Sequence, residues 1–466
     1  MKKLIFVVLI IGAILLTMNN CERPREAPAT DFTGAENEVV LMTLDPGHFH
    51  ASLVQKYRVP QVAPESYVYA PDGPDVQRHL DRIENFNTRD ENPTNWEVNV
   101  YKGDDYLEKM IEEKPGNVVV LAGKNTEKTT YINECVSNGV NVLADKPMVI
   151  FPEKYSELEE AFEMAEEKGV FLYDIMTERN EITSILQKRL SHKPQIFGEM
   201  LEGSEEKPAF IQRSVHYWFK YVAGEPIQRP PWFFDETQRG EPITDVSTHL
   251  VDGIQWAVYP REIIDTNDVE LLSASRWTTP LNFEQFQKVT RLDEWPSYLE
   301  EELEDGKLHV YSNGEMNYTL KDMHARVRVE WDYQALEGGG DSHYSLMRGS
   351  MGNLIIRQGE EQNYQPELYV ELTGDVNPSD YEKTLQDVVR DELGYEGFGI
   401  TKMEENAWRV DIPDRHREGH EAHFRSVMKQ YLEYLQEGEI PDWETSYMRV
   451  KYYLTTQALE MARRSE

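Results

Sequence analysis

Two short segments carry side chains whose types and spacing suit proton transfer. Asp245 and His249 stand four residues apart, so in a helix both side chains would lie on one face and meet the same ligand. Histidine, with an unperturbed pKa of about 6.5, can accept or donate a proton near neutral pH. Lys146 follows an apolar run, where its ammonium would stabilise negative charge on an oxygen. The alternatives are a helix N-cap for Asp245, a packed core residue for His249 and an exposed lysine for Lys146.

The first half of the chain alternates apolar runs with amphipathic stretches. Strands are expected at 39–44, 67–70, 96–101, 118–122, 140–144 and 170–174. Helices are expected at 51–57, 104–113, 127–138 and 152–168. This α/β alternation predicts a Rossmann-type, doubly wound parallel sheet over residues 39–175. Residues 176–466 are expected to form an α+β domain, because segments such as 325–333 alternate apolar and charged residues as an antiparallel strand does.

Polar residues follow several of these strands, at the edge where doubly wound sheets bind ligands. Gly47 would let a pyrophosphate approach the backbone N–H groups of the next helix, and Asp72 would accept hydrogen bonds from a ribose diol. A plain turn at Gly47 is the alternative. The candidate nucleotide-binding residues are Gly47, His48, Phe49, His50, Asp72, Gly123, Asn125, Lys146 and Pro147.

The glycine fingerprint G-x-G-x-x-G of dinucleotide-binding turns is broken here. Asp45 stands at the first glycine position and His50 at the third, so only Gly47 survives. A carboxylate at position 45 would lie unfavourably near a pyrophosphate unless a cation or the two neighbouring histidines compensate.

Two motifs in order make the chain resemble the glucose-fructose oxidoreductase and inositol dehydrogenase (Gfo/Idh/MocA) family. Segment 142–147, VLADKP, resembles the family strand that ends in Glu-Lys-Pro, with Asp145 in place of the glutamate. Segment 244–252, TDVSTHLVD, resembles the family's Asp-x-x-x-His segment. The resemblance runs from about residue 39 to the end. It implies Lys146, Asp245 and His249 as catalytic residues, and an open, mainly antiparallel second sheet that often makes a dimer face.

The resemblance further implies an NAD(P)-dependent oxidoreductase acting on a hydroxyl or ketone of a sugar, sugar derivative or polyol. NAD is favoured over NADP, because a carboxylate at Asp72 would repel a 2′-phosphate. Two other functions stay open: an NAD-dependent, redox-assisted glycosidase, and a non-catalytic sugar-binding lipoprotein that has lost the nucleotide.

Further polar and aromatic residues are candidates for substrate contacts or for metal binding. Aromatic faces stack on sugars, although core packing is an alternative for such residues. The candidate substrate residues are Arg179, His216, Tyr217 and Trp232. His416, His420 and His423 have the spacing of one helix face, but Gly419 interrupts them, so we expect no metal site there.

The N-terminus predicts export. Lys2 and Lys3 precede an apolar run at 4–18, which is short for a membrane span and typical of a secretory signal over residues 1–21. Cys21 stands where a lipoprotein signal has its acylated cysteine, with simple secretion as the alternative. Residues 22–38 then form a tether, and the expected location is the bacterial cell envelope, lipid-anchored, periplasmic or surface-exposed. A tightly held, internally recycled cofactor would suit that location, where free dinucleotide is scarce.

Net charge and cysteine content exclude several kinds of binding partner and site. The 48 Lys and Arg residues against 84 Asp and Glu residues give a net charge of −36, which disfavours nucleic acid and anionic lipid. Only Cys21 and Cys135 occur, so neither a disulfide framework nor a cysteine-built zinc site is expected.

Overall fold

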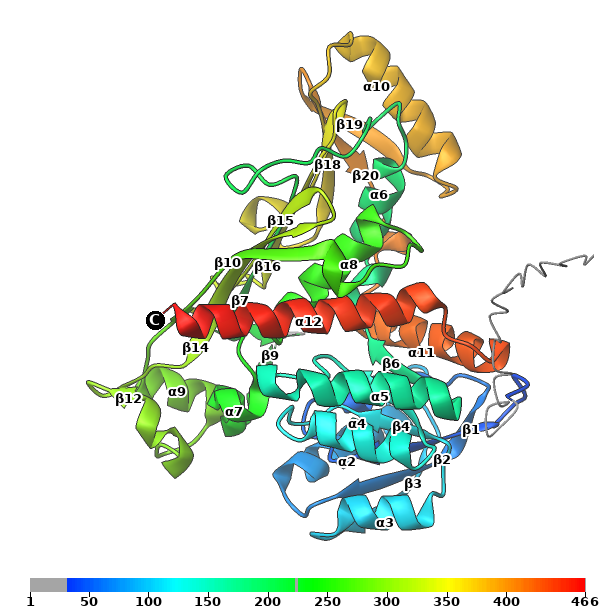
Figure 1. Cartoon of the computed structure of the whole chain (residues 1–466), viewed down its shortest axis with the longest axis vertical. Coiled ribbons are helices and arrows are strands. Elements are labelled where there is room, and N and C mark those ends of the chain that lie inside the picture. The colour runs from blue at the N-terminus through cyan, green and yellow to red at the C-terminus, as the bar shows by residue number, and fades with distance from the viewer. Residues whose placement is uncertain (1–31, 223–224, 466) are drawn as a thin grey trace, which may run out of the picture.

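The computed structural model describes residues 32–222 and 225–465, and its first domain is built on a six-stranded parallel sheet (Figure 1). The strands are β1 (Val39–Leu44), β2 (Val62–Ala70), β3 (Glu97–Lys102), β4 (Val118–Leu121), β5 (Asn141–Asp145) and β6 (Leu172–Ile175). Their spatial order is β3-β2-β1-β4-β5-β6, so the strand order reverses between β1 and β4. This order confirms the predicted doubly wound sheet. Strand β4, Val-Val-Val-Leu, is buried along its whole length.

Helices of the first domain connect the parallel strands. They are α1 (His50–Leu53), α2 (Pro74–Thr88), α3 (Tyr106–Glu113), α4 (Lys128–Ser137) and α5 (Tyr155–Lys168). The predicted helix 51–57 is shortened to α1, because the Gln55 carbonyl accepts the Trp96 indole N–H at 2.7 Å instead of continuing the helix. Helix α2 was not predicted, although Pro74 stands at its first turn.

The second domain contains a nine-stranded, mostly antiparallel sheet. Its spatial order is β10 (Val269–Thr278), β14 (Tyr311–Leu320), β15 (Met323–Gln334), β7 (Phe210–Phe219), β16 (Ser342–Arg348), β17 (Gly352–Gln358), β18 (Glu367–Leu372), β20 (Ala407–Asp411) and β19 (Gly399–Glu404). Only β15 and β7 pair in parallel among these neighbours. The predicted α+β domain with a mainly antiparallel sheet is therefore confirmed.

Small elements and helices surround this sheet. The short strands are β8 (Tyr221–Val222), β9 (Glu225–Pro226), β11 (Leu281–Asn282), β12 (Leu303–Glu304) and β13 (Lys307–Leu308). The helices are α6 (Ile182–Ser191), α7 (Glu236–Arg239), α8 (Ser247–Val258), α9 (Phe283–Thr290) and α10 (Pro378–Asp387).

The two C-terminal helices join the domains. Helix α11 (His420–Glu437) buries Phe424, Val427 and Tyr431 in the core of the first domain. Helix α12 (Asp442–Arg464) crosses between the domains, as Figure 1 shows, and contributes residues to both cores. The C-terminal segment thus returns to the first domain, and the proposed boundary at residue 175 stays a prediction.

The N-terminal part of the described chain is packed rather than extended. Phe32 is buried in the first core, and the Glu38 carboxylate accepts the backbone N–H groups of Thr33, Gly34 and Ala35. Residues 32–38 of the expected tether therefore belong to the folded body. The expected signal and Cys21 lie outside the described residues. Within the described ranges, none of the helices has the length and apolar character needed to cross a membrane.

Candidate active site at the junction of the two domains

The structure brings together Lys146 from the first domain and Asp245 from the second. Lys146 directly follows β5, and its Nζ donates a hydrogen bond to Asp245 Oδ1 at 2.5 Å. Both side chains are about nine-tenths buried. Burial opposes ionisation of Asp245, but Lys146 and Arg239 outweigh it and lower the pKa of this carboxyl. The pair is therefore a buried ion pair that links the two domains.

His249 lies in the first turn of α8, close to this pair. Asp245 precedes the helix, and Val246 rather than Asp245 occupies the N-cap position. Burial and the nearby Lys146 ammonium lower the pKa of His249 well below its usual range, so the imidazole is neutral at pH 7. Its Nδ1 is buried and has no hydrogen-bond partner among the described residues. A neutral, unpartnered imidazole beside an ammonium is suited to accept a proton from a substrate hydroxyl.

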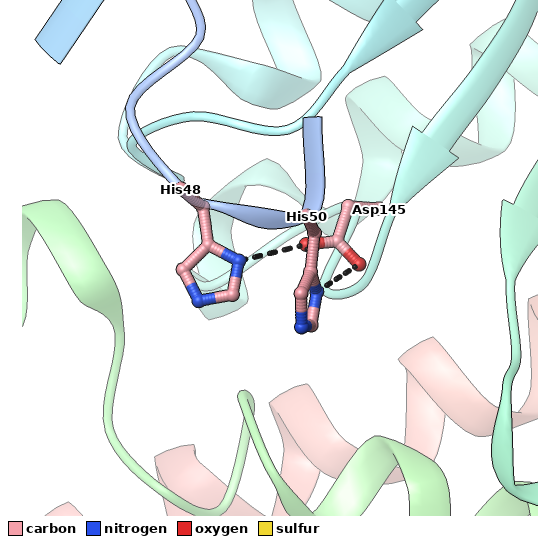
Figure 2. A group of neighbouring side chains, drawn as sticks. All are labelled: His48, His50 and Asp145. Atoms are coloured by element: carbon pink, nitrogen blue, oxygen red, sulfur yellow. Dashed lines mark hydrogen bonds and ion pairs between the residues drawn. The ribbon is translucent and has the colours of Figure 1, made fainter. Parts of the chain in front are cut away.

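A second group of polar side chains adjoins Lys146 at the same edge of the sheet (Figure 2). His50 Nδ1 lies 3.1 and 3.0 Å from the two carboxylate oxygens of Asp145, the last residue of β5. His48 Nδ1 lies 3.5 Å from Asp145 Oδ2. Burial lowers the pKa of both imidazoles, that of His50 to about 3. Phe49, between them, contacts both rings with its own.

The turn after β1 explains how the chain replaces the missing first glycine. Asp45 adopts a φ of 44°, the left-handed conformation that a glycine would otherwise supply. Burial raises the pKa of its carboxyl, which accepts the Tyr131 hydroxyl at 3.1 Å. The turn after β1 and the loop after β4 approach each other closely at Gly123. A Cβ at Gly123 would lie 2.0 Å from the Asp45 carbonyl oxygen. Gly47 itself tolerates a Cβ at ordinary contact distances.

This edge of the sheet fits a dinucleotide in part of its length. Asp72 follows β2 with 78% of its side chain exposed, and Gly73 beside it has open space where a Cβ would be. The N–H groups of Gly47 and His48, however, both donate to the Ala122 carbonyl. Those of Ala51 and Ser52 donate to the His48 and Phe49 carbonyls, so this turn offers few N–H groups to a phosphate. The exposed Asp72 carboxylate suits a ribose diol, so the fit to a dinucleotide is clearest at that end of the group.

Asn125 lies in the loop after β4, as expected, and its hydrogen bonds join this loop to the second domain. Its backbone N–H donates to the Gln238 carbonyl at 2.7 Å, and its side-chain amide donates to the Arg239 carbonyl at 2.6 Å. Its amide oxygen accepts Lys128 Nζ at 2.6 Å. Helix α7 of the second domain is thereby docked on the loop after β4. A direct nucleotide contact for Asn125 stays a prediction.

The expected substrate residues are dispersed. Trp232 lies near Gly47, and its indole nitrogen is 3.4 Å from Asp75 Oδ1, on the nucleotide side of the junction. His216 Nδ1 is 3.0 Å from Asp341 Oδ2, and its ring stacks on Trp331 at 5.0 Å. Tyr217, on the same strand β7, is only partly buried. These contacts leave the predicted substrate roles untested.

Arg179 belongs to a separate, fully buried group of charges, which we call the junction network. Its guanidinium donates to both Asp252 oxygens at 2.6 and 2.7 Å and to Glu444 at 2.7 Å. With these bonds made, Arg179 joins α8 to α12, and we do not include it in the substrate site. The junction network consists of Arg179, Lys451, Asp174, Asp252 and Glu444.

The sequence reasoning missed two polar residues of the site, Lys128 and Arg239, and considered a third, His420, only together with His416 and His423. Lys128 is fully buried and donates to the Asp145 carbonyl at 2.9 Å, and burial lowers its pKa to about 8. Arg239 is buried against aromatic rings. His420 begins α11 with its ring 5.5 Å from that of His50, while His416 lies outside that helix. The sequence carries a signal for one of these residues only: Lys128 follows Asn125 by three positions, about one helical turn, which could have indicated the contact between their side chains.

Comparison with known proteins gives two family matches that divide the chain between them. The model described as "Oxidoreductase family, NAD-binding Rossmann fold" matches residues 76–174. The model described as "Putative oxidoreductase C terminal domain" matches residues 186–463. The first match begins beyond Asp72, so it does not include the turn with the altered glycine fingerprint. A search of curated proteins finds no significant match.

Solved structures share the fold over nearly the whole chain. One, titled as a putative oxidoreductase from Parabacteroides merdae, is 51% identical, has a TM-score of 0.91, and matches 94% of this chain and 100% of its own. A levoglucosan dehydrogenase in complex with NADH is 12% identical, with a TM-score of 0.58 over 92% and 98% of the two chains. KijD10, a 3-ketoreductase from Actinomadura kijaniata in complex with NADP and TDP-benzene, is 12% identical, with a TM-score of 0.53 over 90% and 96%. The last two show likeness of fold alone.

Proposed function

Because the chain belongs to the Gfo/Idh/MocA family of NAD(P)-dependent oxidoreductases, we propose that it oxidises or reduces a sugar, sugar derivative or polyol at a hydroxyl or ketone. The observation that carries this proposal is the buried Lys146–Asp245 ion pair with the unpartnered His249 imidazole beside it. Oxidation of a carbinol requires a base for the O–H proton and a cation for the developing oxyanion, and these residues supply both.

Each of the three residues has one task in this proposal. His249 accepts the hydroxyl proton at its neutral imidazole, or returns it when a ketone is reduced. Lys146 offers its ammonium to the substrate oxygen, which lowers the energy of the charge that develops there. Asp245 fixes the position of Lys146 through the 2.5 Å hydrogen bond.

NAD(P), when bound, supplies the hydride acceptor or donor. The chain would hold it along the turn after β1, the loop after β4 and Asp72 after β2. We favour NAD because Asp72 presents an exposed carboxylate to a ribose, although Lys102 lies 3.0 Å from it and offsets part of the repulsion of a 2′-phosphate. A cofactor that stays bound through turnover belongs to the same proposal.

The sugar or polyol class of substrate is supported by the neighbours in fold and by the second domain. Two neighbours in fold are a levoglucosan dehydrogenase and a 3-ketoreductase that was solved with TDP-benzene. In this chain, His216 stacked on Trp331 and the partly buried Tyr217 offer ring faces and polar edges of the kind that bind carbohydrate.

The first test identifies the nucleotide. The purified chain is denatured, and any released nucleotide is identified by mass spectrometry, before and after incubation with NAD(H) and NADP(H). We expect about one NAD(H) per chain and absorbance changes of the nicotinamide on addition of a sugar or polyol. A chain that neither releases nor binds dinucleotide would refute the proposal. Cleavage of aryl glycosides by the loaded chain would instead assign it to redox-assisted glycosidases.

The second test removes the proton carrier. His249→Gln is expected to lower turnover by about 100-fold to 10,000-fold while leaving nucleotide binding unchanged. His416→Gln is the matched control. His416 precedes α11 in the sequence and lies outside the site, so this variant should keep full turnover. Retention of turnover in His249→Gln would show that another group carries the proton.

We also propose that the chain is anchored to the bacterial envelope through Cys21. The signal-like sequence before Cys21 supports this. Cells expressing the chain and its Cys21→Ala variant are labelled with an alkyne analogue of palmitate. The label should appear on the parent chain and be absent from the variant, and equal labelling of the two would refute the anchor.

A further inference from the structure

We propose that His48, His50 and Asp145 bind a divalent transition-metal ion at the edge of the sheet next to Lys146. Two imidazoles and one carboxylate, with a position left for water or substrate, form the ligand set of many catalytic zinc and other transition-metal sites. His48, His50 and Asp145 carry neither the hydride nor the proton in the proposed reaction, although His48 and His50 lie in the turn after β1 that would hold the nucleotide. Metal binding and nucleotide binding are therefore measured separately below.

The three potential ligand atoms already converge. Their mutual separations are all within 4.8 Å, and Figure 2 shows both Nδ1 atoms turned toward the Asp145 carboxylate. Two ligands at roughly 2.1 Å from a tetrahedral ion stand about 3.4 Å apart. The measured separations from Asp145 Oδ2 are 3.5 Å for His48 Nδ1 and 3.0 Å for His50 Nδ1. Small side-chain adjustments would therefore complete the site.

Hydrogen bonding alone does not account for the whole cluster. His50 Nδ1 can donate to Asp145, whereas His48 Nδ1 is buried and reaches the same carboxylate only at 3.5 Å, longer than a normal hydrogen bond. A buried nitrogen with so long a contact is poorly satisfied, and a metal ion would satisfy it.

The cluster arises at the positions where the two sequence motifs depart from their usual residues. His50 stands at the third glycine position of the broken fingerprint, and Asp145 replaces the glutamate of Glu-Lys-Pro. The two departures are 95 residues apart in the sequence, yet their side chains are in contact. His50 thus places an imidazole at this turn, and Asp145 supplies the carboxylate that completes the ligand set.

The nearby cations leave the carboxylate available. Lys146 gives its hydrogen bond to Asp245, and Lys128 gives one to the backbone carbonyl of Asp145 rather than to its side chain. Among the described residues, the Asp145 carboxylate is contacted by His50 and, at 3.5 Å, by His48, which are the two other proposed ligands. His420, whose ring lies 5.5 Å from that of His50, is the nearest further imidazole and could approach the fourth position.

An ion at this place would lie beside the residue that we assign to the substrate oxygen. Asp145 and Lys146 are consecutive, so a metal-bound water or substrate oxygen would share the edge of the sheet with the Lys146 ammonium. There the ion would act as a Lewis acid that polarises a substrate hydroxyl or ketone.

The test measures metal binding directly. The full chain, purified in mild detergent without a polyhistidine tag, is stripped with a chelator and titrated with Co²⁺, whose visible absorption reports ligand number. Zn²⁺ is then added as competitor. We expect about one Co²⁺ per chain, displaced by Zn²⁺. His48→Gln, His50→Gln and Asp145→Asn should each weaken binding at least about 100-fold, since even residues beyond the ligands change metal affinity by roughly 10-fold to 100-fold.

His416→Gln serves as the matched control and should bind Co²⁺ as the parent chain does, because its ring lies away from the cluster. The outcome can be read even if one variant misfolds: His48, the most exposed of the three side chains, and the isosteric Asp145→Asn provide independent tests. Less than a tenth of an equivalent of Co²⁺, or undiminished binding in His48→Gln and Asp145→Asn, would overturn the proposal. If these variants lose affinity for NAD(H) but keep Co²⁺, the proposal is also overturned and the cluster belongs to the nucleotide site.

Discussion

Two buried groups of charged and polar side chains lie at the junction of the domains, and they differ in how completely they are paired. In the junction network, Lys451 is fully buried and contacts Asp174 at 2.7 Å and Asp252 at 2.9 Å, while Arg179 binds Asp252 and Glu444. Tyrosine hydroxyls complete it, since Tyr452 donates to Asp174 at 2.8 Å. The residues of this network have their hydrogen-bonding groups directed at one another.

The second group, which we call the site cluster, contains polar atoms whose hydrogen bonding is incomplete. It consists of Lys146, Asp245, His249, His48, His50 and Asp145. Among the described residues, His249 Nδ1 is buried without a hydrogen-bond partner, and His48 Nδ1 is buried with only a 3.5 Å contact to Asp145 Oδ2. Buried polar atoms without partners are costly and are concentrated where a ligand completes them. Both groups contain buried charges, so burial alone does not identify a binding site. The two groups differ in their hydrogen-bond partners, which are incomplete only in the group that we propose to bind a ligand.

The strongest test of this comparison removes a charge from the junction network. Lys451→Met should lower the free energy of unfolding by about 3–5 kcal/mol, because two buried carboxylates lose their shared cation. Urea unfolding followed by circular dichroism measures the change. A loss below about 1 kcal/mol would show that the network does not stabilise the junction.

A smaller effect is expected when one carboxylate is neutralised. Asp252→Asn should cost about 2 kcal/mol at pH 7, through weaker hydrogen bonds to Arg179 and Lys451. Burial opposes ionisation of Asp252, but these cations outweigh it and lower its folded pKa.

The same lowered pKa sets the pH dependence. The contribution of Asp252 is complete above the unfolded pKa of about 3.9 and is lost as the pH falls from there toward the folded pKa. Urea unfolding at a series of pH values should therefore show the parent and Asp252→Asn converging below about pH 4. A gap that does not depend on pH would exclude this cause.

An exposed pair provides the contrast in burial. Lys402 lies 2.8 Å from Glu382, with about two-fifths of each side chain exposed. Lys402→Met should change the free energy of unfolding by at most about 1 kcal/mol, because solvent screens the pair. Urea unfolding beside Lys451→Met gives the comparison, and equal losses in the two variants would show that pairing matters more than burial.

Much of the fold and the central pair of the site could be predicted from the sequence. Apolar runs such as Val118–Leu121 mark buried strands, and the Lys-Pro and Asp-x-x-x-His motifs point to Lys146, Asp245 and His249. Helix α2 was missed even though Val76, Leu80 and Ile83 follow Pro74 at helical spacing; its many charged residues mask that face.

Other features depend on contacts between distant parts of the chain. Arg179 reads as a substrate residue until Asp252 and Glu444 are placed around it. The contact of His50 with Asp145 joins two segments that no local pattern connects. Asn125 docks α7 because the second domain folds back over the loop after β4. Contacts with residues far away in the sequence determine the roles of these side chains. Local sequence patterns do not reveal such contacts.

The smallest expected change in stability comes from the site cluster itself. His249→Leu replaces an imidazole whose Nδ1 is buried without a partner, so it removes a polar atom that costs free energy in the folded state. We expect the free energy of unfolding to stay within about 1 kcal/mol of the parent or to rise, as substitutions in unpaired functional sites often do. Turnover should nevertheless fall as in His249→Gln. Urea unfolding and a turnover assay on the same preparation measure both quantities. A loss of stability comparable to that of Lys451→Met would mean that His249 holds the fold together as the junction network does, and the distinction between the two groups would fail.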